Sequence, residues 1–458
     1  MLALLLLAAL GQTVTAPEPP GTLQSRPAAG NPSPLQALVD RAQPGDTVRV
    51  PPGTYHGDLV IDRPLRLAGD GWPRLVGSGA GSVVQVRAHD VVIEGFEIDG
   101  RGGGDLGRDP AGVHVAGHRV TVRNLRIANT LFGVYLREAD GATVEAVVIR
   151  GIPGKAPGEK GSGVHVWNTR GFRILSSDIA GVRDGLYIQS SYDGVIRGNQ
   201  ARDLRYGLHY MFSDDNVFED NVFAGGDAGT AIMYSKRITF RRNRFLHNRG
   251  FASVGLLFKS CEDVLAEDNL IADNARGLFI EDSYRVIIRR NVIAQSDTAI
   301  VLYDLSGDHR IEGNSFVANL SPLFLTARRT NAVFDGNYWS ENAGPDLDGD
   351  GHSDEPYRLS NVFDHLRGNL TAADLFAQGL AATAVGMAER AFPVLDPRPV
   401  VDPRPLARPP ALPDVPPPFR RTTGPSLSGL AASTGAVGFG LAILARWRRP
   451  ARRRETRR

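Results

Sequence analysis

The chain has 458 residues, with 52 Lys and Arg against 50 Asp and Glu, 52 glycines and one cysteine. The formal net charge of +2 argues against a dedicated nucleic-acid-binding protein, and a single cysteine excludes both an intramolecular disulfide framework and a CxxC zinc site. The glycine content favours many turns and short strands over a helix bundle.

The N-terminus carries the pattern of an export signal. Residues 2–10 form an uncharged apolar run that is too short to span a bilayer, and small residues suited to cleavage follow at Gly11 and Ala16. We therefore predict a signal peptide over residues 1–16, a linker over 17–34, and export of the chain that follows.

Residues 35–369 are predicted to form an all-β, right-handed parallel β-helix. A short capping helix is expected over 35–42, and PGDTVRVPPGTY at 44–55 is typical of a first strand and a tight turn. Short alternating segments such as GVHVAG then recur at intervals of 21–24 residues, with one interval of 30 that contains an insertion over 152–161. A unit of this length cannot bury its own apolar face, whereas stacked copies can, which gives about 11–13 coils.

Asparagine ends the second strand of each repeat. It occurs in six consecutive units from Asn199 to Asn314, Asn337 closes the series, and Asn124 matches in an early unit. Asparagine at one turn of every coil suits a left-handed backbone and a hydrogen-bonded ladder between coils.

One outward-facing column of side chains is rich in histidine and tyrosine. In GVHVAG the two valines face inward, so the histidine between them faces outward. Alignment of the repeats then predicts a single column that contains His114, Tyr135, His165, Tyr187, His209 and Met233. We interpret its first four members as a face for a protein partner.

The end of this column predicts a copper site. His209 and Met233 are expected on neighbouring coils, about 5 Å apart at the backbone, with Met211 two residues after His209 on the same face. Thioether and imidazole donors suit copper, especially Cu(I). The alternative is a surface stripe used for protein contacts or sugar stacking without a metal. Cys261, in the turn KSCED, is either a further thiolate ligand or a half-buried turn cysteine, and the pattern favours the second.

A polysaccharide lyase or hydrolase is the main alternative function for a β-helix, and a structural envelope protein is another. Sugar hydrolysis needs paired carboxylates, for which Asp214 and Asp215 are candidates, with Lys236, Arg237 and Lys259 as basic residues on later coils. Adjacent strand residues point in opposite directions, so the two aspartates converge only in a turn. No Gly-His-Gly or Arg-x-Lys signature accompanies them, and we expect no enzyme.

An acidic segment near the end of the repeats resembles half of a calcium loop. Asp346, Asp348 and Asp350 alternate before Gly351, and Asp354 fits a further ligand position. The closing glutamate of an EF-hand is replaced by tyrosine, so two interpretations stay open. The segment either binds Ca²⁺ or forms an acidic turn that caps the rod.

The remaining chain predicts a membrane anchor. A helix is expected over 370–392, a proline-rich linker over 393–421 and an uncharged transmembrane helix over 422–445. The tail 446–458 contains eight arginines, so the positive-inside rule leaves it in the cytoplasm and the body of the protein in the periplasm.

Three segments carry a family resemblance: GLHYMFSDDNVFEDN at 207–221, AIMYSKRITFRRN at 231–243, and NYWSENAGPDLDGDGHSDEPYR at 337–358. In these segments the chain resembles NosD, the exported maturation factor of nitrous oxide reductase. The resemblance implies a non-enzymatic role with an ABC transporter ATPase and permease, a copper chaperone lipoprotein and the apo-reductase. It implies help in building the copper–sulfide centre of the reductase, and adds weight to copper at His209, Met211 and Met233.

Overall fold

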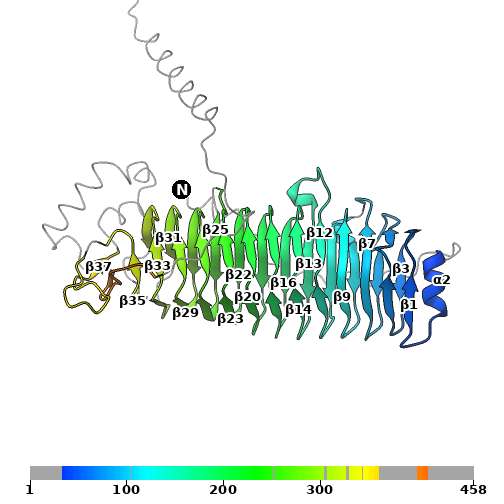
Figure 1. Ribbon diagram of the computed structural model, residues 1–458, viewed down its shortest axis with the longest axis horizontal. Coiled ribbons are helices and arrows are strands. Elements are labelled where there is room, and N and C mark those ends of the chain that lie inside the picture. The colour runs from blue at the N-terminus through cyan, green and yellow to red at the C-terminus, as the bar shows by residue number, and fades with distance from the viewer. Residues whose placement is uncertain are drawn as a thin grey trace, which may run out of the picture. The chain divides into compact units, whose positions relative to one another are not determined.

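The protein is a parallel β-helix, in which the chain winds repeatedly around one core (Figure 1). The computed structural model describes residues 33–103, 105–250, 253–303, 307–325, 330–342, 344–359 and 400–410. Within these residues the strands form two parallel sheets that run the length of the rod, and a third sheet of two short strands.

The face that carries the predicted histidine and tyrosine column is a twelve-stranded parallel sheet. Its twelve strands agree with the predicted 11–13 coils and confirm the parallel β-helix. In order, the strands are β3 (Leu59–Ile61), β6 (Val84–Val86), β8 (Ala111–Val115), β10 (Phe132–Arg137), β13 (Ser162–Trp167), β16 (Asp184–Gln189), β19 (Tyr206–Met211), β22 (Ala228–Met233), β25 (Val254–Lys259), β28 (Arg276–Glu281), β31 (Thr298–Tyr303) and β34 (Ser321–Leu325).

The rest of each coil lies in a larger sheet of 24 strands. These strands are β1 (Thr47–Val50), β2 (Thr54–His56), β4 (Arg66–Gly69), β5 (Arg74–Val76), β7 (Val92–Asp99), β9 (Thr121–Ala128), β11 (Thr143–Glu145), β12 (Val148–Arg150), β14 (Arg173–Leu175), β15 (Asp178–Ala180), β17 (Val195–Arg197), β18 (Gln200–Arg202), β20 (Val217–Glu219), β21 (Val222–Ala224), β23 (Lys236–Arg241), β24 (Arg244–Leu246), β26 (Glu262–Glu267), β27 (Leu270–Ala272), β29 (Tyr284–Arg289), β30 (Val292–Ala294), β32 (Arg310–Glu312), β33 (Ser315–Val317), β35 (Val333–Asp335) and β36 (Tyr338–Trp339). Two 3₁₀ turns, η1 (Leu106–Arg108) and η2 (Pro157–Glu159), lie in loops between coils.

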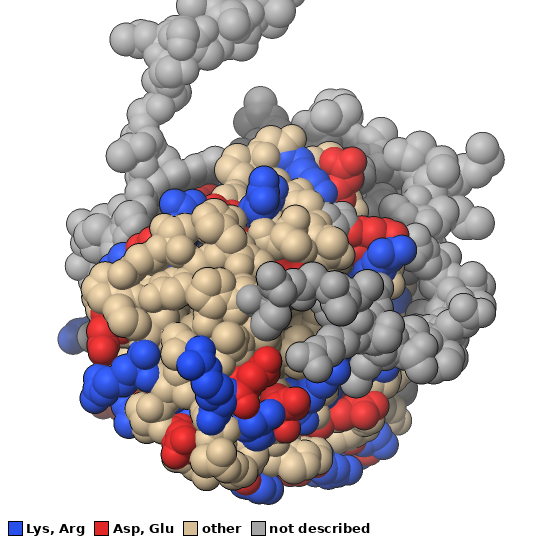
Figure 2. All heavy atoms as spheres, turned by 90° about the vertical axis from the view of Figure 1, so that its right-hand side faces the viewer, with Lys and Arg blue, Asp and Glu red and all other residues tan. Residues whose placement is uncertain are grey.

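The N-terminal end of the rod is covered by helix α2 (Pro34–Arg41), close to the predicted 35–42. The side chain of Ser33 caps the helix by accepting from the backbone N–H of Gln36 at 3.1 Å. The Gln36 amide in turn bonds both backbone groups of Val60 in β3, so the helix covers an edge that otherwise has unpaired donors and acceptors. Seen from this end, basic and acidic side chains lie next to one another and form no patch of one sign on the described surface (Figure 2).

The predicted asparagine ladder is present inside the rod, from Asn199 to Asn337. Backbone N–H and side-chain Nδ2 of each asparagine donate to Oδ1 of the asparagine one coil on, at 2.8–3.1 Å. The prediction that these asparagines are left-handed is wrong. The left-handed residue is the one before, such as Asp220 at φ 54° or Arg242 at φ 52°, and this corner turns the asparagine into the core. Asn124 is exposed and itself left-handed, so it lies outside the ladder.

The C-terminal end is closed by a segment that we predicted to be linker. Residues 400–410, within the predicted linker 393–421, return to the last coil, where β38 (Val401–Asp402) pairs antiparallel with β37 (Tyr357–Arg358). The fully buried Asp402 carboxylate accepts from Asn337 N and Nδ2, both at 2.9 Å, where the next asparagine of the ladder would stand. The proline content suggested an extended spacer, but this buried acceptor holds the segment against the rod.

Several predicted segments lie outside the described residues: the signal peptide 1–16, most of the linker 17–34, the whole of the helix 370–392, the transmembrane helix 422–445 and the basic tail 446–458. In the part of the chain that is described, no helix has the length and apolar character needed to cross a membrane.

Candidate metal-binding face

The outward-facing column of the twelve-stranded sheet is a continuous stack of rings. As predicted, His114, Tyr135, His165, Tyr187 and His209 occupy successive strands in register. Their ring centroids are 5.1, 4.4, 4.4 and 4.8 Å apart along the column. Parallel strands place identical positions about 4.8 Å apart, so rings on successive strands touch, and the contacts along the column alternate between stacked and edge-to-face.

The first part of this column is packed at Tyr135, and its use as a face for a protein partner stays a prediction. Tyr135 is only 4% exposed, because Phe132, Ile152 and Leu106 from neighbouring strands and loops pack around it. Burial lowers the pKa of His114 to about 4 and that of His165 to about 3, so both imidazoles are neutral at physiological pH. Tyr135 is therefore the covered member of the column, whereas His114, His165, Tyr187 and His209 are each partly exposed.

The predicted neighbour of His209 is wrong by two residues. His209 pairs with Ala231, and Met233 instead pairs with Met211 in the next column of side chains. The predicted alignment failed because one coil is longer than its neighbours. Gly229 stands opposite Gly207, and the long coil then runs for 26 residues from Gly229 to Gly255. A Cβ at Gly229 would lie 2.4 Å from the carbonyl oxygen of Gly255, so only glycine fits where the two backbones come this close. Gly229, not Ala231, is therefore the residue equivalent to the glycines at this position of the other repeats, such as Gly207 and Gly255.

The corrected register brings the two methionines together. Met211 and Met233 lie directly across from each other on adjacent strands, where backbones are about 4.8 Å apart, and both are partly exposed. His209 is two residues before Met211 on the same outward face, and the small Ala231 fills the fourth position of this group. The three predicted ligands are therefore neighbours, with the methionine pair as the closest contact.

His209 has an acidic neighbour that the repeat pattern did not predict. Asp184, from the preceding coil, is fully buried, and its Oδ2 lies 3.5 Å from His209 Nδ1. Burial alone would raise the pKa of Asp184, but its interactions with His209 and the hydrogen bonds from Arg205 outweigh burial and lower the pKa to about 2. A carboxylate at Nδ1 is the arrangement that orients a histidine to bind metal through Nε2.

The surroundings of the methionine pair carry little net charge. In the same column Gln189 precedes Met211 and Lys259 follows Met233. The Lys259 ammonium is paired with Glu281 at 3.0 Å. Two thioethers and an imidazole nitrogen suit a soft monovalent cation better than a hard divalent one.

Cys261 is not part of this face. It is 2% exposed and occupies a position in an internal ladder that serine fills in neighbouring coils, including Ser235 and Ser283. Its thiol donates weakly to the carbonyl oxygens of Ile232 and Lys259, at 3.5 and 3.4 Å. Burial raises the pKa of Cys261 to about 12, so the interpretation as a turn cysteine is correct and a thiolate ligand is not supported.

The candidate catalytic residues are occupied by ion pairs between coils. Asp215 binds Arg237 through two hydrogen bonds, and Asp214 accepts from the backbone N–H of Lys236. Lys236 and Lys259 are paired with glutamates of the following coils. Each of these contacts ties one coil to the next, and none leaves two carboxylates facing a shared space.

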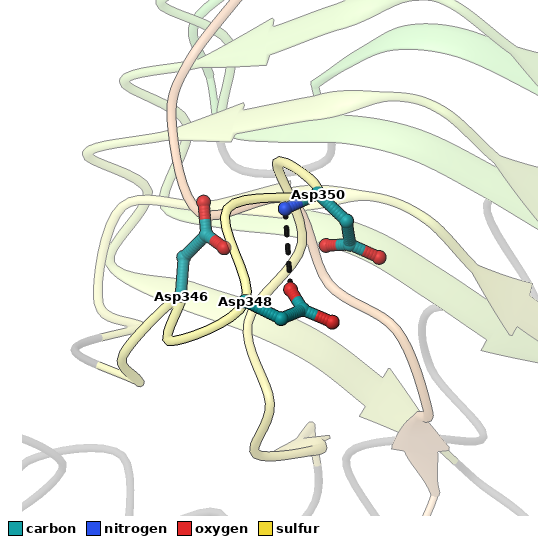
Figure 3. Close-up of side chains that lie close together, drawn as sticks. All are labelled: Asp346, Asp348 and Asp350. Atoms are coloured by element: carbon teal, nitrogen blue, oxygen red, sulfur yellow. Dashed lines mark hydrogen bonds between the residues drawn. The ribbon is translucent and has the colours of Figure 1, made fainter.

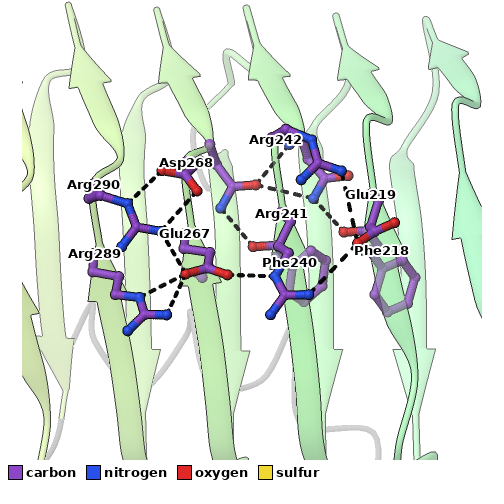
Figure 4. Close-up of polar contacts among 12 residues, drawn as sticks. Phe218, Glu219, Phe240, Arg241, Arg242, Glu267, Asp268, Arg289 and Arg290 are labelled. Atoms are coloured by element: carbon purple, nitrogen blue, oxygen red, sulfur yellow. Dashed lines mark hydrogen bonds and ion pairs between the residues drawn. The ribbon is translucent and has the colours of Figure 1, made fainter.

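The same pattern is densest around Glu267 on the 24-stranded sheet (Figure 4). This 4% exposed carboxylate binds Arg241, Arg289 and Arg290 from the coils on both sides. Burial would raise the pKa of Glu267, but the hydrogen bonds from these arginines outweigh it and lower the pKa to about 2. The charged side chains of this face act as clamps between coils.

The predicted calcium ligands are only partly brought together. Carboxylate oxygens of Asp346, Asp348 and Asp350 lie within 4.8 Å of one another in a single loop (Figure 3). Each also accepts from a nearby backbone N–H of the loop, and Asp354 is turned to the N–H of Leu347. Calcium binding at this loop stays a prediction.

Fold and side chains together define a β-helical repeat protein whose outer face presents imidazole and paired thioether donors. A family profile described as "Periplasmic copper-binding protein (NosD)" matches residues 145–345. The probable ABC transporter binding protein NosD of Pseudomonas aeruginosa PAO1 is 30% identical over 379 residues, which cover 79% of this chain and 88% of that protein. The protein of the same name from Stutzerimonas stutzeri is 29% identical over 364 residues, covering 76% and 83%. The chain belongs to the NosD family.

A solved structure supports the fold alone. The A-module of a mannuronan C-5 epimerase from Azotobacter vinelandii superposes with a TM-score of 0.55 at 15% identity, covering 66% of this chain and 95% of that module. That module is an enzyme, whereas the curated NosD relatives are named as binding proteins. At this identity the likeness carries no argument about catalysis.

Proposed function

We propose that the protein is a non-enzymatic copper-handling scaffold of the periplasm, which works with an ABC transporter to assemble the copper–sulfide centre of nitrous oxide reductase. The observation that carries this proposal is the in-register pair Met211 and Met233 beside His209, on the outer face of a rod from a family described as periplasmic and copper-binding.

The chemistry of the face supports transient binding of Cu(I) as cargo. Thioethers are neutral, soft ligands, and His209 adds an imidazole beside the Asp184 carboxylate. The absence of a thiolate in this set favours an ion that is held and released rather than stored, because the single cysteine is buried elsewhere. Copper would arrive from a copper chaperone lipoprotein and pass to the apo-reductase.

The rigid rod supports a scaffold role. Coils are joined by the asparagine ladder and by clamps such as Glu267 with its three arginines, so the sheet offers a fixed platform for large partners. The ABC transporter ATPase and permease are proposed as partners at the membrane, with anchoring by the predicted span 422–445. The alternative of a polysaccharide enzyme loses support from the ion pairs of Asp214, Asp215 and Lys236.

An anaerobic competition titration with a chromophoric Cu(I) chelator tests the copper site. The full chain in detergent should bind Cu(I), and the Met211→Leu, Met233→Leu double variant should lose that binding. Met387→Leu is the matched control, because it removes a third thioether of the chain and should leave binding unchanged. Equal stoichiometry in the double variant and the wild type would remove the methionines from the site.

Two further measurements test the roles of His209 and of the protein in cells. Asp184→Asn should weaken Cu(I) binding about tenfold, since carboxylates beside metal-binding histidines contribute that much to metal affinity. In cells, deletion of the gene should leave the reductase present but without its copper–sulfide centre. A reductase with a normal spectrum of that centre in the deletion strain would refute the maturation role.

A further inference from the structure

Two exposed aromatic residues flank the methionine pair. Phe212 and Tyr234 directly follow Met211 and Met233, and their rings stack at 5.1 Å with an angle of 10° between planes. Both side chains stay substantially open to solvent, with 36% and 39% exposure. Large rings left open on a β-helix surface call for an explanation, because stacking alone has not removed them from water.

The backbone corner explains why these rings lie beside the thioethers. Alternation along a strand would turn the residue after an outward-facing methionine into the core. Phe212 and Tyr234 instead adopt left-handed backbone, with φ of 50° and 52°, and the inward position falls to the buried serine that follows each. Methionine and aromatic ring therefore both face outward on each coil, and the two adjacent coils present a cluster of two thioethers and two rings.

Other coils use small or polar residues at this corner. The equivalent left-handed residues of the neighbouring coils are Glu138, Asn168, Ser190, Ser260 and Asp282. A bulky side chain is an unfavourable choice where φ is positive, and serine or asparagine closes the same corner without a ring. The fold does not require aromatic residues here, and they occur on the two coils that carry the methionines.

We propose that the faces of Phe212 and Tyr234 complete the Cu(I) site of Met211 and Met233 through cation–π contact. This inference rests on the proposed function, since it adds to the same site. Two thioethers and an imidazole nitrogen add no negative charge to offset that of the bound ion, and Lys259, in register with Met233, is paired with Glu281. Aromatic faces stabilise such a charge, exclude water from it, and disfavour strongly hydrated divalent ions.

Substitution of both rings by leucine isolates their contribution. Phe212→Leu with Tyr234→Leu keeps a bulky apolar residue at each corner but removes the ring faces. The full chain should still bind the same number of Cu(I) ions, with affinity reduced about tenfold. Tyr303→Leu is the matched control, because Tyr303 is a 41% exposed tyrosine on the same sheet away from the methionines, and its loss should leave the affinity unchanged.

Tyr234→Trp provides a spectroscopic test in the opposite direction. Tryptophan has the strongest ring face, so this variant should bind Cu(I) more tightly than the wild type. Its additional tryptophan emission should be quenched on addition of Cu(I), and this quenching should disappear when Met211 and Met233 are also replaced by leucine.

The outcomes separate this inference from the proposed function. If the methionine double variant loses Cu(I) while the leucine ring variant keeps wild-type affinity and Tyr234→Trp shows no quenching, the rings have no part in the site and the inference is overturned. If the methionine double variant retains Cu(I), the copper site itself is misplaced, and both the proposed ligands and the aromatic contribution are refuted.

Discussion

Replacement of Asp402 should uncouple the C-terminal segment from the rod. This carboxylate is fully buried and takes the place of the next asparagine in the ladder. Its Oδ2 accepts from Asn337 N, Asn337 Nδ2 and Trp339 Nε1, at 2.9, 2.9 and 3.1 Å, and its Oδ1 accepts from Gly336 N at 3.0 Å. Asp402→Ala leaves these four donors without an acceptor.

The expected magnitude follows from the number of donors. Each buried donor left unsatisfied costs about 1–3 kcal/mol, and water that enters at the end of the rod offsets part of this, so we expect a loss of about 3–5 kcal/mol for Asp402→Ala. Asp402→Asn should cost less, about 1–2 kcal/mol, because the amide oxygen can still accept from the three donors that bind Oδ2. The order alanine worse than asparagine is specific to this arrangement.

Chemical denaturation followed by circular dichroism gives the two unfolding free energies, and native-state hydrogen exchange locates the change. In a stacked repeat the terminal coil can open separately, so exchange should accelerate first at the amides of Asn337 and Trp339. Glu355→Ala, an exposed residue near the same end, should stay within about 0.5 kcal/mol of the wild type. An unaltered free energy in Asp402→Ala, or equal losses in both Asp402 variants, would refute the capping role.

Three further predictions concern acid, the thiol and calcium. The pKa of Glu267 falls from an ordinary value of 4.5 to about 2 in the folded rod. The ionised carboxylate therefore stabilises the fold fully above pH 4.5, and this stabilisation is lost as the pH falls towards 2. Glu267→Gln should flatten the pH dependence of the unfolding free energy in that window. Cys261 should resist iodoacetamide until the protein unfolds, and Cys261→Ser should change the melting temperature little, since serine fills the same ladder position in adjacent coils; rapid alkylation of the folded protein would contradict its burial. About 1 mM Ca²⁺ should raise the melting temperature of the wild type but not of Asp348→Asn if the acidic loop binds calcium, and identical melting curves would favour the acidic turn.

The fold was predictable because its information is repeated. A strand pattern of period 2 that recurs about every 22 residues specifies stacked coils, and errors in one coil are corrected by the others. The asparagine ladder followed from the same repetition. Its backbone conformation did not, because the corner residue can be aspartate, arginine or glycine, and these share a left-handed φ rather than a chemical type.

The acidic neighbour of His209 could not be predicted from the sequence, and the reason is a different one. Asp184 and His209 are 25 residues apart on adjacent coils, and Asp184 pairs in register with Tyr206, three positions before His209. Their contact depends on the diagonal between columns, which the repeat period does not specify. The return of residues 400–410 to the rod could not be predicted either. The proline-rich composition of this segment is typical of an extended spacer, but the buried Asp402 carboxylate holds the segment against the last coil.

The misplacement of Met233 shows how a β-helix can be read more reliably. An alignment error of one residue exchanges the core and solvent faces, so the hydrophobic pattern reveals it. An error of two residues keeps every side chain on its correct face and moves it by one column. Hydrophobic alternation therefore cannot fix the column. Backbone contact between coils can, because Gly207, Gly229 and Gly255 stand where a Cβ would collide with the next coil. Alignment on these glycines pairs Met211 with Met233 directly, and it turns a predicted histidine–methionine contact into the thioether pair on which the copper proposal now rests.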